Sequence, residues 1–422
     1  MLYLKTPGSK EPQAQAGIDI RDTVIRIIED VRSGGLAAIS RYSVSLDGYS
    51  GPLIVPRSNL KEAERSIPAP LKEAIRSAAG NIRLFHSLQR SLFNGMECKI
   101  IDGVLAGIRF TPAGSTGIYI PGGRFPLPST ALMGVIAAQE AGVKRIVALT
   151  PPSSQDGPHP IILGTLSILG VREVWSVGGA QAVAAAAFGA RDLEPVDMLA
   201  GPGNVYVTEA KRILFGSFGI DGLAGPSEVL IIADRSADPS FIAADLLAQS
   251  EHDPLAKATL LCTDRGTAES SLSALENLLG TGTASSIARD SWLDNGCVVI
   301  CTLEEAVAFA NRESPEHIVL AVEDPRDILS KCLSFGSAFL GNYSAQSFGD
   351  YVAGTNHILP TGRSARFAGG VWTGTFMRPQ TYTEIGKEGA EALAEAGAVM
   401  AAAEGLQAHR LAMLLRTEGR TR

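Results

Sequence analysis

Long apolar runs are missing from this sequence. The longest continuous apolar stretches include Ala182 to Phe188 and Val229 to Ala233, which are far shorter than the roughly 20 residues that a membrane-spanning helix needs. Residues 1–5 are not followed by the continuous apolar region and small-residue cleavage site of a signal peptide. We therefore expect a cytoplasmic protein that has no membrane partner.

Cysteine is scarce. The 422-residue chain has five cysteines, at positions 98, 262, 297, 301 and 332. An odd number in a long chain, with no spacing typical of metal sites, argues against a disulfide framework. We expect all five thiols to be reduced and most of them to be buried.

Positive charge is also in short supply. The chain has 37 Lys and Arg residues against 44 Asp and Glu residues, which gives a formal net charge of -7 at pH 7. Binding to nucleic-acid phosphates requires clustered Lys and Arg, so we expect no nucleic-acid partner. Hydrophobic residues make up 45% of the chain and charged residues 19%, which is typical of a globular protein. The length predicts more than one domain.

The G-x-G-x-x-G fingerprint of dinucleotide-binding domains is absent as well. Three glycine turns follow predicted strands instead, at residues 119–123, 178–181 and 201–204. Each turn can bring bare backbone close to a ligand, and the last two open helices whose N-termini favour phosphate. Such turns occur throughout α/β proteins, so alone they predict only a ligand cleft at the ends of strands.

Strands and helices alternate along most of the chain. Residues 19–90 have helical periodicity, and residues 97–120 alternate in polarity as strands do, around a turn at Asp102-Gly103. Strand candidates then recur between helical segments, at residues 117–120, 145–149, 173–177, 197–200, 228–233, 258–263, 297–301, 317–322 and 337–340. This pattern predicts an α/β fold with two Rossmann-like parallel-sheet domains and helical N- and C-terminal extensions.

Four regions are expected from this pattern. Residues 1–110 are a helical region that ends in a strand hairpin, and residues 111–223 are the first α/β domain. Residues 224–378 are the second α/β domain. Residues 379–422 are rich in Ala and Glu, which suits a packed helical segment better than disorder.

Four side chains in the second half of the chain could hold a metal ion. Gln249 and His252 lie three residues apart at the end of a predicted helix, and therefore on one face. Asp350 stands in a Gly-rich segment that we expect to be a loop, and His409 stands near the end of the chain. An amide oxygen, a carboxylate and two imidazoles suit zinc, manganese or cobalt. Because none of these four positions is a cysteine, an open catalytic site is favoured over a closed structural one. By itself, this helical spacing is more typical of a solvated helix face.

A second group of functional side chains precedes the apolar run 318–322, which is predicted to be a buried strand. Glu316 and His317 stand in the loop before it, where adjacent residues can both face one cleft. A carboxylate beside an imidazole offers two proton acceptors of different strength, as a reaction with two deprotonations needs. An ordinary solvated loop is the simpler interpretation of these two residues alone.

Further motifs join these groups into one pattern. They are residues 81–86 (NIRLFH), 126–130 (PLPST), 224–228 (AGPSE), 341–344 (GNYS), 355–357 (TNH) and 404–409 (EGLQAH). With these motifs, the chain resembles the histidinol dehydrogenase family over nearly its whole length.

The resemblance implies a role for each candidate residue. Gln249, His252, Asp350 and His409 would bind one zinc ion per subunit, and Glu316 and His317 would be the catalytic acid/base pair. Side chains that would contact the substrate are Ser227, Gln249, His252, His317, Asp350, His357, Glu404 and His409. Tyr119, Gln181 and Asn204 would line the NAD site, on the first α/β domain. The family is homodimeric, so the C-terminal segment with Glu404 and His409 would complete the partner's site.

The implied reaction is the four-electron oxidation of L-histidinol, through the aldehyde, to L-histidine with two NAD. His317 would take the hydroxyl proton, and Glu316 would activate the water that attacks the aldehyde. A related zinc and NAD dehydrogenase of another small alcohol, such as sulfopropanediol, is the alternative. Pro315 and residues 355–357 favour histidinol. An inactive nucleotide-binding homologue is a third possibility, but it would be expected to have lost ligands.

Overall fold

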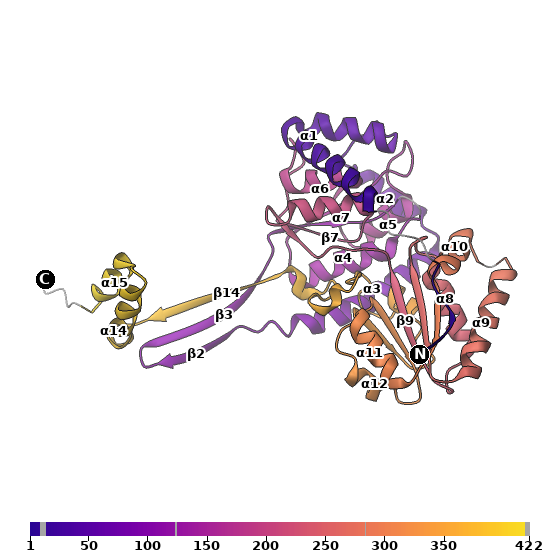
Figure 1. Cartoon of the computed structure of the whole chain (residues 1–422). Coiled ribbons are helices and arrows are strands. Elements are labelled where there is room, and N and C mark those ends of the chain that lie inside the picture. Colours follow the sequence, from indigo (N-terminus) through magenta and orange to yellow (C-terminus); the bar gives the residue numbers. More distant parts are fainter. Residues whose placement is uncertain (9–13, 123–124, 283, 418–422) are drawn as a thin grey trace.

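Two parallel sheets form the body of the protein, and a long arm projects from it (Figure 1). The computed structural model describes residues 1–8, 14–122, 125–282 and 284–417. The predicted α/β class with two parallel-sheet units is confirmed. No helix of the described residues is long and apolar enough to cross a membrane.

The first sheet has the strand order β6-β5-β4-β7-β8, and all of its neighbours pair in parallel. Its strands are β4 (Ser115–Tyr119), β5 (Arg145–Thr150), β6 (Glu173–Ser176), β7 (Met198–Ala200) and β8 (Gly219–Ile220). The connecting helices are α4 (Pro128–Ala141), α5 (Pro160–Ile168), α6 (Gly179–Phe188) and α7 (Val205–Leu214). Because both faces of the sheet are covered, its strands are short apolar runs rather than alternating ones.

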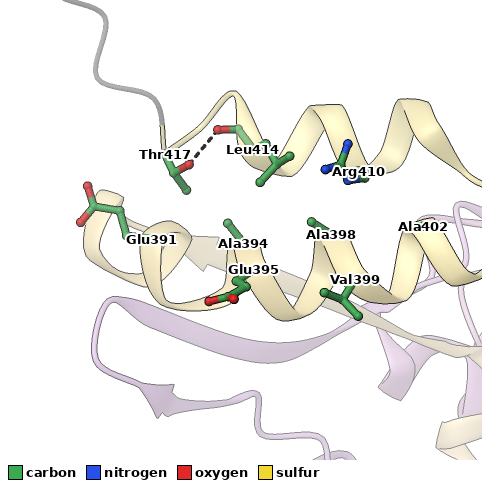
Figure 2. A pocket seen from close by; sticks show the side chains of 9 residues that line it. All are labelled: Glu391, Ala394, Glu395, Ala398, Val399, Ala402, Arg410, Leu414 and Thr417. Atoms are coloured by element: carbon green, nitrogen blue, oxygen red, sulfur yellow. Dashed lines mark hydrogen bonds between the residues drawn. The ribbon is translucent and has the colours of Figure 1, made fainter.

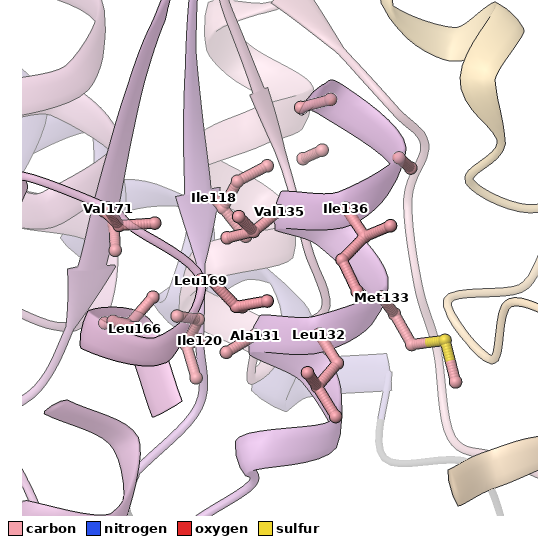
Figure 3. Packing of buried hydrophobic residues seen from close by; sticks show 14 of the residues in the cluster. Ile118, Ile120, Ala131, Leu132, Met133, Val135, Ile136, Leu166, Leu169 and Val171 are labelled. Atoms are coloured by element: carbon pink, nitrogen blue, oxygen red, sulfur yellow. The ribbon is translucent and has the colours of Figure 1, made fainter. Parts of the chain in front are cut away.

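Successive side chains of β4 enter two different cores, as the two-residue period of a strand requires. Ile118 and Ile120 pack among residues of α4 and α5, such as Val135 and Leu166 (Figure 3). Tyr119 points to the opposite core, which α6 and α7 share with the N-terminal helix. Burying one such isoleucine contributes about 1.5–3 kcal/mol, so these cores fix the carboxyl ends of the strands in place.

The N-terminal helices cover this sheet. They are α1 (Ala14–Asp47), α2 (Arg57–Ser66) and α3 (Ala69–Arg90), and they contact α6 and α7, α5, and α4 respectively. The sequence predicted a helical N-terminal region, but residues Leu2–Lys5 form a strand, β1, at the edge of the second sheet. Four residues are too few for periodicity to reveal their partner.

The second sheet has the order β1-β11-β10-β9-β12-β13, in which only β1 is antiparallel among the described strands. Its other strands are β9 (Glu228–Ala233), β10 (Lys257–Cys262), β11 (Cys297–Ile300), β12 (His317–Ala321) and β13 (Ser337–Leu340). Its helices are α8 (Pro239–Ser250), α9 (Arg265–Gly280), α10 (Ser286–Asn295), α11 (Leu303–Glu313), α12 (Pro325–Lys331) and α13 (Gln346–Tyr351). All five cysteines are free thiols and four of them are buried, as expected.

The arm is a three-stranded antiparallel sheet with a helical hairpin at its tip (Figure 1). Two short 3-10 helices, η1 (Ser364–Arg366) and η2 (Thr373–Phe376), lead into it. The sheet contains β2 (Met96–Ile101), β3 (Val104–Pro112) and β14 (Met377–Ile385), and the hairpin contains α14 (Lys387–Ala403) and α15 (Gln407–Leu414). The helix predicted from residue 379 is wrong as far as Ile385, because all nine residues of β14 pair with β3.

Small side chains of α14 face larger side chains of α15 in the hairpin. Ala394, Ala398 and Ala402 of α14 face Leu414 and Arg410 of α15 across a groove of about 500 Å³ (Figure 2). The groove lies at the tip of the arm, away from both parallel sheets (Figure 1).

Candidate active site

The predicted acid/base pair lies at the amino end of the second sheet. His317 opens β12 and pairs with Val229 of β9, which places Glu316 beside Glu228. The backbone N–H of Glu228 donates to Glu316 Oε2 at 2.9 Å, and Nδ1 of His317 lies 3.7 Å from the same oxygen. Glu316 and His317 are 5% and 3% exposed. The structure therefore excludes the solvated-loop interpretation, because both groups are buried together.

Burial changes the proton affinity of both groups. It raises the pKa of Glu316 to about 7, although the nearby His317 opposes the change. Burial lowers the pKa of His317, but the carboxylates of Glu316 and Asp350 outweigh it, so the pKa of His317 is raised overall. Both ring nitrogens of His317 are buried and have no hydrogen-bond partner in the structure. A buried imidazole with unused nitrogens beside a carboxyl of neutral pKa can exchange protons with a bound molecule.

The candidate metal ligand Gln249 lies in the last turn of α8, whereas His252, which the sequence placed in the same helix, follows its end at Ser250 by two residues. A helix that follows a parallel strand returns the chain to the amino end of the sheet, so this end approaches the acid/base pair. The pKa of His252 is lowered by desolvation, and Asp350 and His317 are close enough to influence it. At neutral pH, His252 therefore presents a neutral imidazole, which is the form that binds metals.

Asp350 lies in α13, where the sequence predicted a loop. The adjacent Gly349 does not break this helix; it allows Phe339 to pack against it, since a Cβ at Gly349 would lie 2.5 Å from Cε1 of that ring. The Phe339 ring also packs on His317, with the ring centroids 5.9 Å apart. Asp350 Oδ1 consequently lies 3.6 Å from Nε2 of His317. Burial raises the pKa of Asp350, but the neighbouring imidazoles, above all His317, together lower it by more. The pKa is therefore below its ordinary value, and the carboxylate is ionised at neutral pH.

The donor set of the body suits a metal ion but is incomplete. Gln249 is fully buried, and its Nε2 has no hydrogen-bond partner, while Oε1 accepts from Nε2 of Gln346 at 2.7 Å. An amide oxygen, a neutral imidazole and an ionised carboxylate are ligands that zinc accepts. Within the described ranges, no three His, Cys, Asp or Glu side chains gather as a metal-binding group.

Two predicted substrate contacts border the cluster. His357 donates from Nδ1 to the carbonyl oxygen of Asp350 at 2.8 Å, and Thr130 Oγ1 lies 3.3 Å from its Nε2. Burial lowers the pKa of His357, so its Nε2 is an acceptor at neutral pH. Ser227 directly precedes β9, and its carbonyl oxygen accepts from the backbone N–H of Lys257.

Two other predicted residues lie far from this cluster in the same chain. Glu404 follows α14 as its C-cap, and His409 lies in α15. Both are exposed at the tip of the arm, and the arm holds them away from the second sheet (Figure 1). The structure brings the other predicted metal and substrate residues together without these two.

The three residues expected to line a nucleotide site border the carboxyl end of the first sheet. Tyr119 ends β4, and its hydroxyl accepts from the backbone N–H of Gly179 at 3.0 Å. Gln181 is 1% exposed; its Nε2 donates to Asp47 at 3.4 Å, and its Oε1 has no partner. Asn204 caps α7, with Oδ1 accepting from two backbone N–H groups. Gly123 of the first predicted glycine turn lies outside the described residues.

Sequence reasoning missed a buried ion pair that supports this region. Lys211 Nζ donates to Asp221 Oδ1 at 2.6 Å and to the carbonyl oxygen of Gly201 at 2.7 Å. The other oxygen of Asp221 accepts from the N–H of Gly201 at 2.8 Å. The pair thus holds both backbone groups of the glycine that opens the third predicted turn. A lysine and an aspartate ten residues apart give no periodic signal that could have revealed it.

Comparison with known proteins identifies the family of the chain. The family model for histidinol dehydrogenase matches residues 10–417. Similar proteins include histidinol dehydrogenases of Prochlorococcus marinus, 42% identical over 99% of this chain and 93% of that protein, and of Gluconobacter oxydans, 40% identical over 94% and 93%. The crystal structure of histidinol dehydrogenase from Elizabethkingia anophelis superposes with a TM-score of 0.90 at 37% identity, covering 98% and 94% of the two chains. The chain therefore belongs to the histidinol dehydrogenase family and is an oxidoreductase of that type.

Proposed function

We propose that this protein oxidises L-histidinol to L-histidine in two steps, through the aldehyde, as a cytoplasmic enzyme that uses zinc and two NAD molecules. The buried Glu316–His317 pair next to Asp350 is the observation that carries the proposal. Two oxidations require two proton acceptors, and this pair supplies an imidazole and a carboxyl whose pKa is about 7.

His317 takes the proton from the substrate hydroxyl in the first oxidation and from the hydrated aldehyde in the second. Its unpartnered ring nitrogens can reach a bound molecule, and the neighbouring carboxylates stabilise the imidazolium that forms. Glu316 takes a proton from the water that attacks the aldehyde. The fixed hydrogen bond from the N–H of Glu228 orients the carboxylate for this step.

Gln249, His252 and Asp350 would hold the zinc ion, together with His409. When bound, zinc would orient the substrate by attracting its nitrogen atoms. His357 presents an acceptor nitrogen, and Ser227 lies beside the acid/base pair, so both can contact the substrate.

A second copy of the chain would supply His409 and Glu404, in a homodimer. The arm that carries them is built for contact with another protein: all six residues of β2 are exposed, and Val399 and Met400 of α14 are 65% and 66% exposed. Exposed apolar surface on an extended strand and helix is typical of an interface. The separation of α14 and α15 from the body of their own chain supports a dimer in which each arm reaches the other subunit (Figure 1).

The first sheet would bind NAD, which accepts the hydride in each oxidation. Tyr119, Gln181 and Asn204 border the carboxyl end of that sheet, where α6 and α7 begin. Backbone N–H groups at helix N-termini favour the dinucleotide phosphates.

Turnover with two substrates tests the proposal. The purified protein should form NADH from L-histidinol and NAD, and not from 2,3-dihydroxypropane-1-sulfonate. A chelator should abolish turnover, and added zinc or manganese should restore it, while circular dichroism and NAD binding remain unchanged. Full activity in metal-free protein would contradict the zinc assignment. Turnover of the sulfonate but not of L-histidinol would contradict the proposed substrate.

A further inference from the structure

Two buried amide side chains meet beside the acid/base pair. Gln346 and Gln249 are 1% and 0% exposed, and Nε2 of Gln346 donates to Oε1 of Gln249 at 2.7 Å. Each amide leaves one buried atom without a partner, namely Nε2 of Gln249 and Oε1 of Gln346. An unsatisfied buried polar atom is destabilising, so a native structure keeps such atoms where they have a function.

The two ends of an amide have the same shape but opposite chemistry. A half-turn of both side-chain amides would preserve one hydrogen bond, now from Nε2 of Gln249 to Oε1 of Gln346. It would also exchange the unpartnered atom of Gln249: an oxygen with free lone pairs would replace a nitrogen that can only donate. Only the oxygen can bind a cation.

The positions of the two amides on their helices place them near the other candidate metal ligands. Gln346 and Asp350 are four residues apart on α13, while Gln249 lies in the last turn of α8 and His252 follows that helix. Residues four apart lie on one face of a helix. Gln346 therefore meets Gln249 on the same side of α13 from which Asp350 addresses His317 and His252.

We propose that Gln346 is a positioning residue that orients the amide of Gln249. In the metal-loaded protein, Oε1 of Gln346 accepts from Nε2 of Gln249, so that Oε1 of Gln249 faces the ion. Gln346 does not touch the metal; it selects which end of Gln249 does. This inference rests on the proposed zinc site and adds to it a residue that acts through a ligand.

Zinc affinity of the full-length protein, measured by competition with a chromophoric chelator, tests the proposal without reference to turnover. Gln346→Met keeps the side-chain length but removes the acceptor, and should weaken zinc binding roughly tenfold to a hundredfold. The ionised carboxylate of Gln346→Glu can accept from Gln249 but cannot donate, and its negative charge favours a cation, so at pH 8 this variant should bind zinc at least as tightly as the wild type. Gln139→Met is the matched control, since that amide bonds to Leu169 and Arg83 elsewhere; it should leave zinc affinity unchanged.

Each outcome bears on a defined claim. Unchanged affinity in Gln346→Met would overturn the inference. So would equal loss in Gln346→Glu and Gln346→Met, because it would mean that Gln249 needs a donor rather than an acceptor. If Gln346→Met fails to fold, judged by its NAD affinity and thermal midpoint, Gln346→Glu alone decides. If the wild type binds no zinc, the proposed metal site itself is wrong.

Discussion

At the scale of single residues, the proposed mechanism gives the sequence neighbours Glu316 and His317 different tasks. In it, His317 serves both hydride transfers, whereas Glu316 is needed only where water attacks. The difference arises because an alcohol already carries the proton to be removed, while an aldehyde must first be hydrated.

Glu316→Gln keeps the size of the side chain but removes the basic carboxylate. A general base contributes roughly a hundredfold to ten-thousandfold in rate, so NADH formation from histidinaldehyde should fall by that factor. Reduction of the aldehyde by NADH should survive. His317→Asn should damage both reactions. Single-turnover assays of the two half-reactions measure this, and equal losses in both for Glu316→Gln would remove its separate role.

The pH dependence of aldehyde oxidation follows from the raised pKa of Glu316. Below a pKa of about 7 the carboxyl is protonated and cannot accept a proton, so the rate should rise with pH up to about 7 and then level off. Glu316→Gln lacks this group and should lose the part of the rise that Glu316 contributes, while any rise from His317 remains. Single-turnover rates from pH 5 to 9 provide the measurement, and a rise of equal size in the variant would assign the titration to another group.

Several site residues could be predicted from sequence because each belongs to a short local motif, as Glu316 does. Gln346 could not: its partner Gln249 is 97 residues away, and only the packing of α13 on α8 joins them. The helical conformation of Asp350 was missed for a related reason. Gly349 indicated a loop, and only the close approach of the Phe339 ring explains why a glycine stands in a helix there.

At the scale of elements, the turn after β7 depends on one glycine. Gly201 has a φ of 120°, and a Cβ there would overlap the carbonyl oxygen of Tyr119. Gly201→Ala should displace the turn and weaken NAD binding about fivefold to 150-fold, because such strain costs about 1–3 kcal/mol. Gly222→Ala is the control, since a Cβ there meets no atom within 4 Å. Isothermal titration with NAD compares the two; equal affinities would show that the turn does not contact the cofactor.

The Lys211–Asp221 ion pair stabilises the same turn. The two side chains are 3% and 7% exposed, so Asp221→Ala leaves a buried lysine without its charge partner. The free energy of unfolding should fall by about 3–5 kcal/mol. The ion pair of Glu269 with Arg265 is exposed, since the two side chains are 54% and 58% exposed. Glu269→Ala should therefore lower the free energy of unfolding by at most about 0.5 kcal/mol. Denaturant titration distinguishes them, and similar losses would contradict the assigned importance of burial.

Strand and helix positions in the two parallel sheets were predictable because their apolar runs are continuous and their turns are marked by glycine. β14 was not predictable, since its partner β3 is more than 260 residues earlier in the chain. Its burial pattern is mostly exposed, so the alternation that would indicate a strand facing a core is missing. Pairing along the whole strand, rather than burial, determines its conformation.

At the scale of the whole molecule, the arm separates two candidate site residues from the rest. Mixing His317→Ala chains with His409→Ala chains should restore activity, because one of the two sites in each heterodimer would then be intact. With random exchange, roughly a quarter of the wild-type activity is expected. Activity that stays at zero, although exchange is demonstrated, would show that each site is built within a single chain.

The number of NADH molecules formed per L-histidinol consumed tests the central claim most directly. Two acceptors of different strength in one buried site imply that the aldehyde is oxidised where it forms. The account predicts two NADH per histidinol, with histidine as the product and no free aldehyde. One NADH per histidinol, with the aldehyde accumulating, would contradict it.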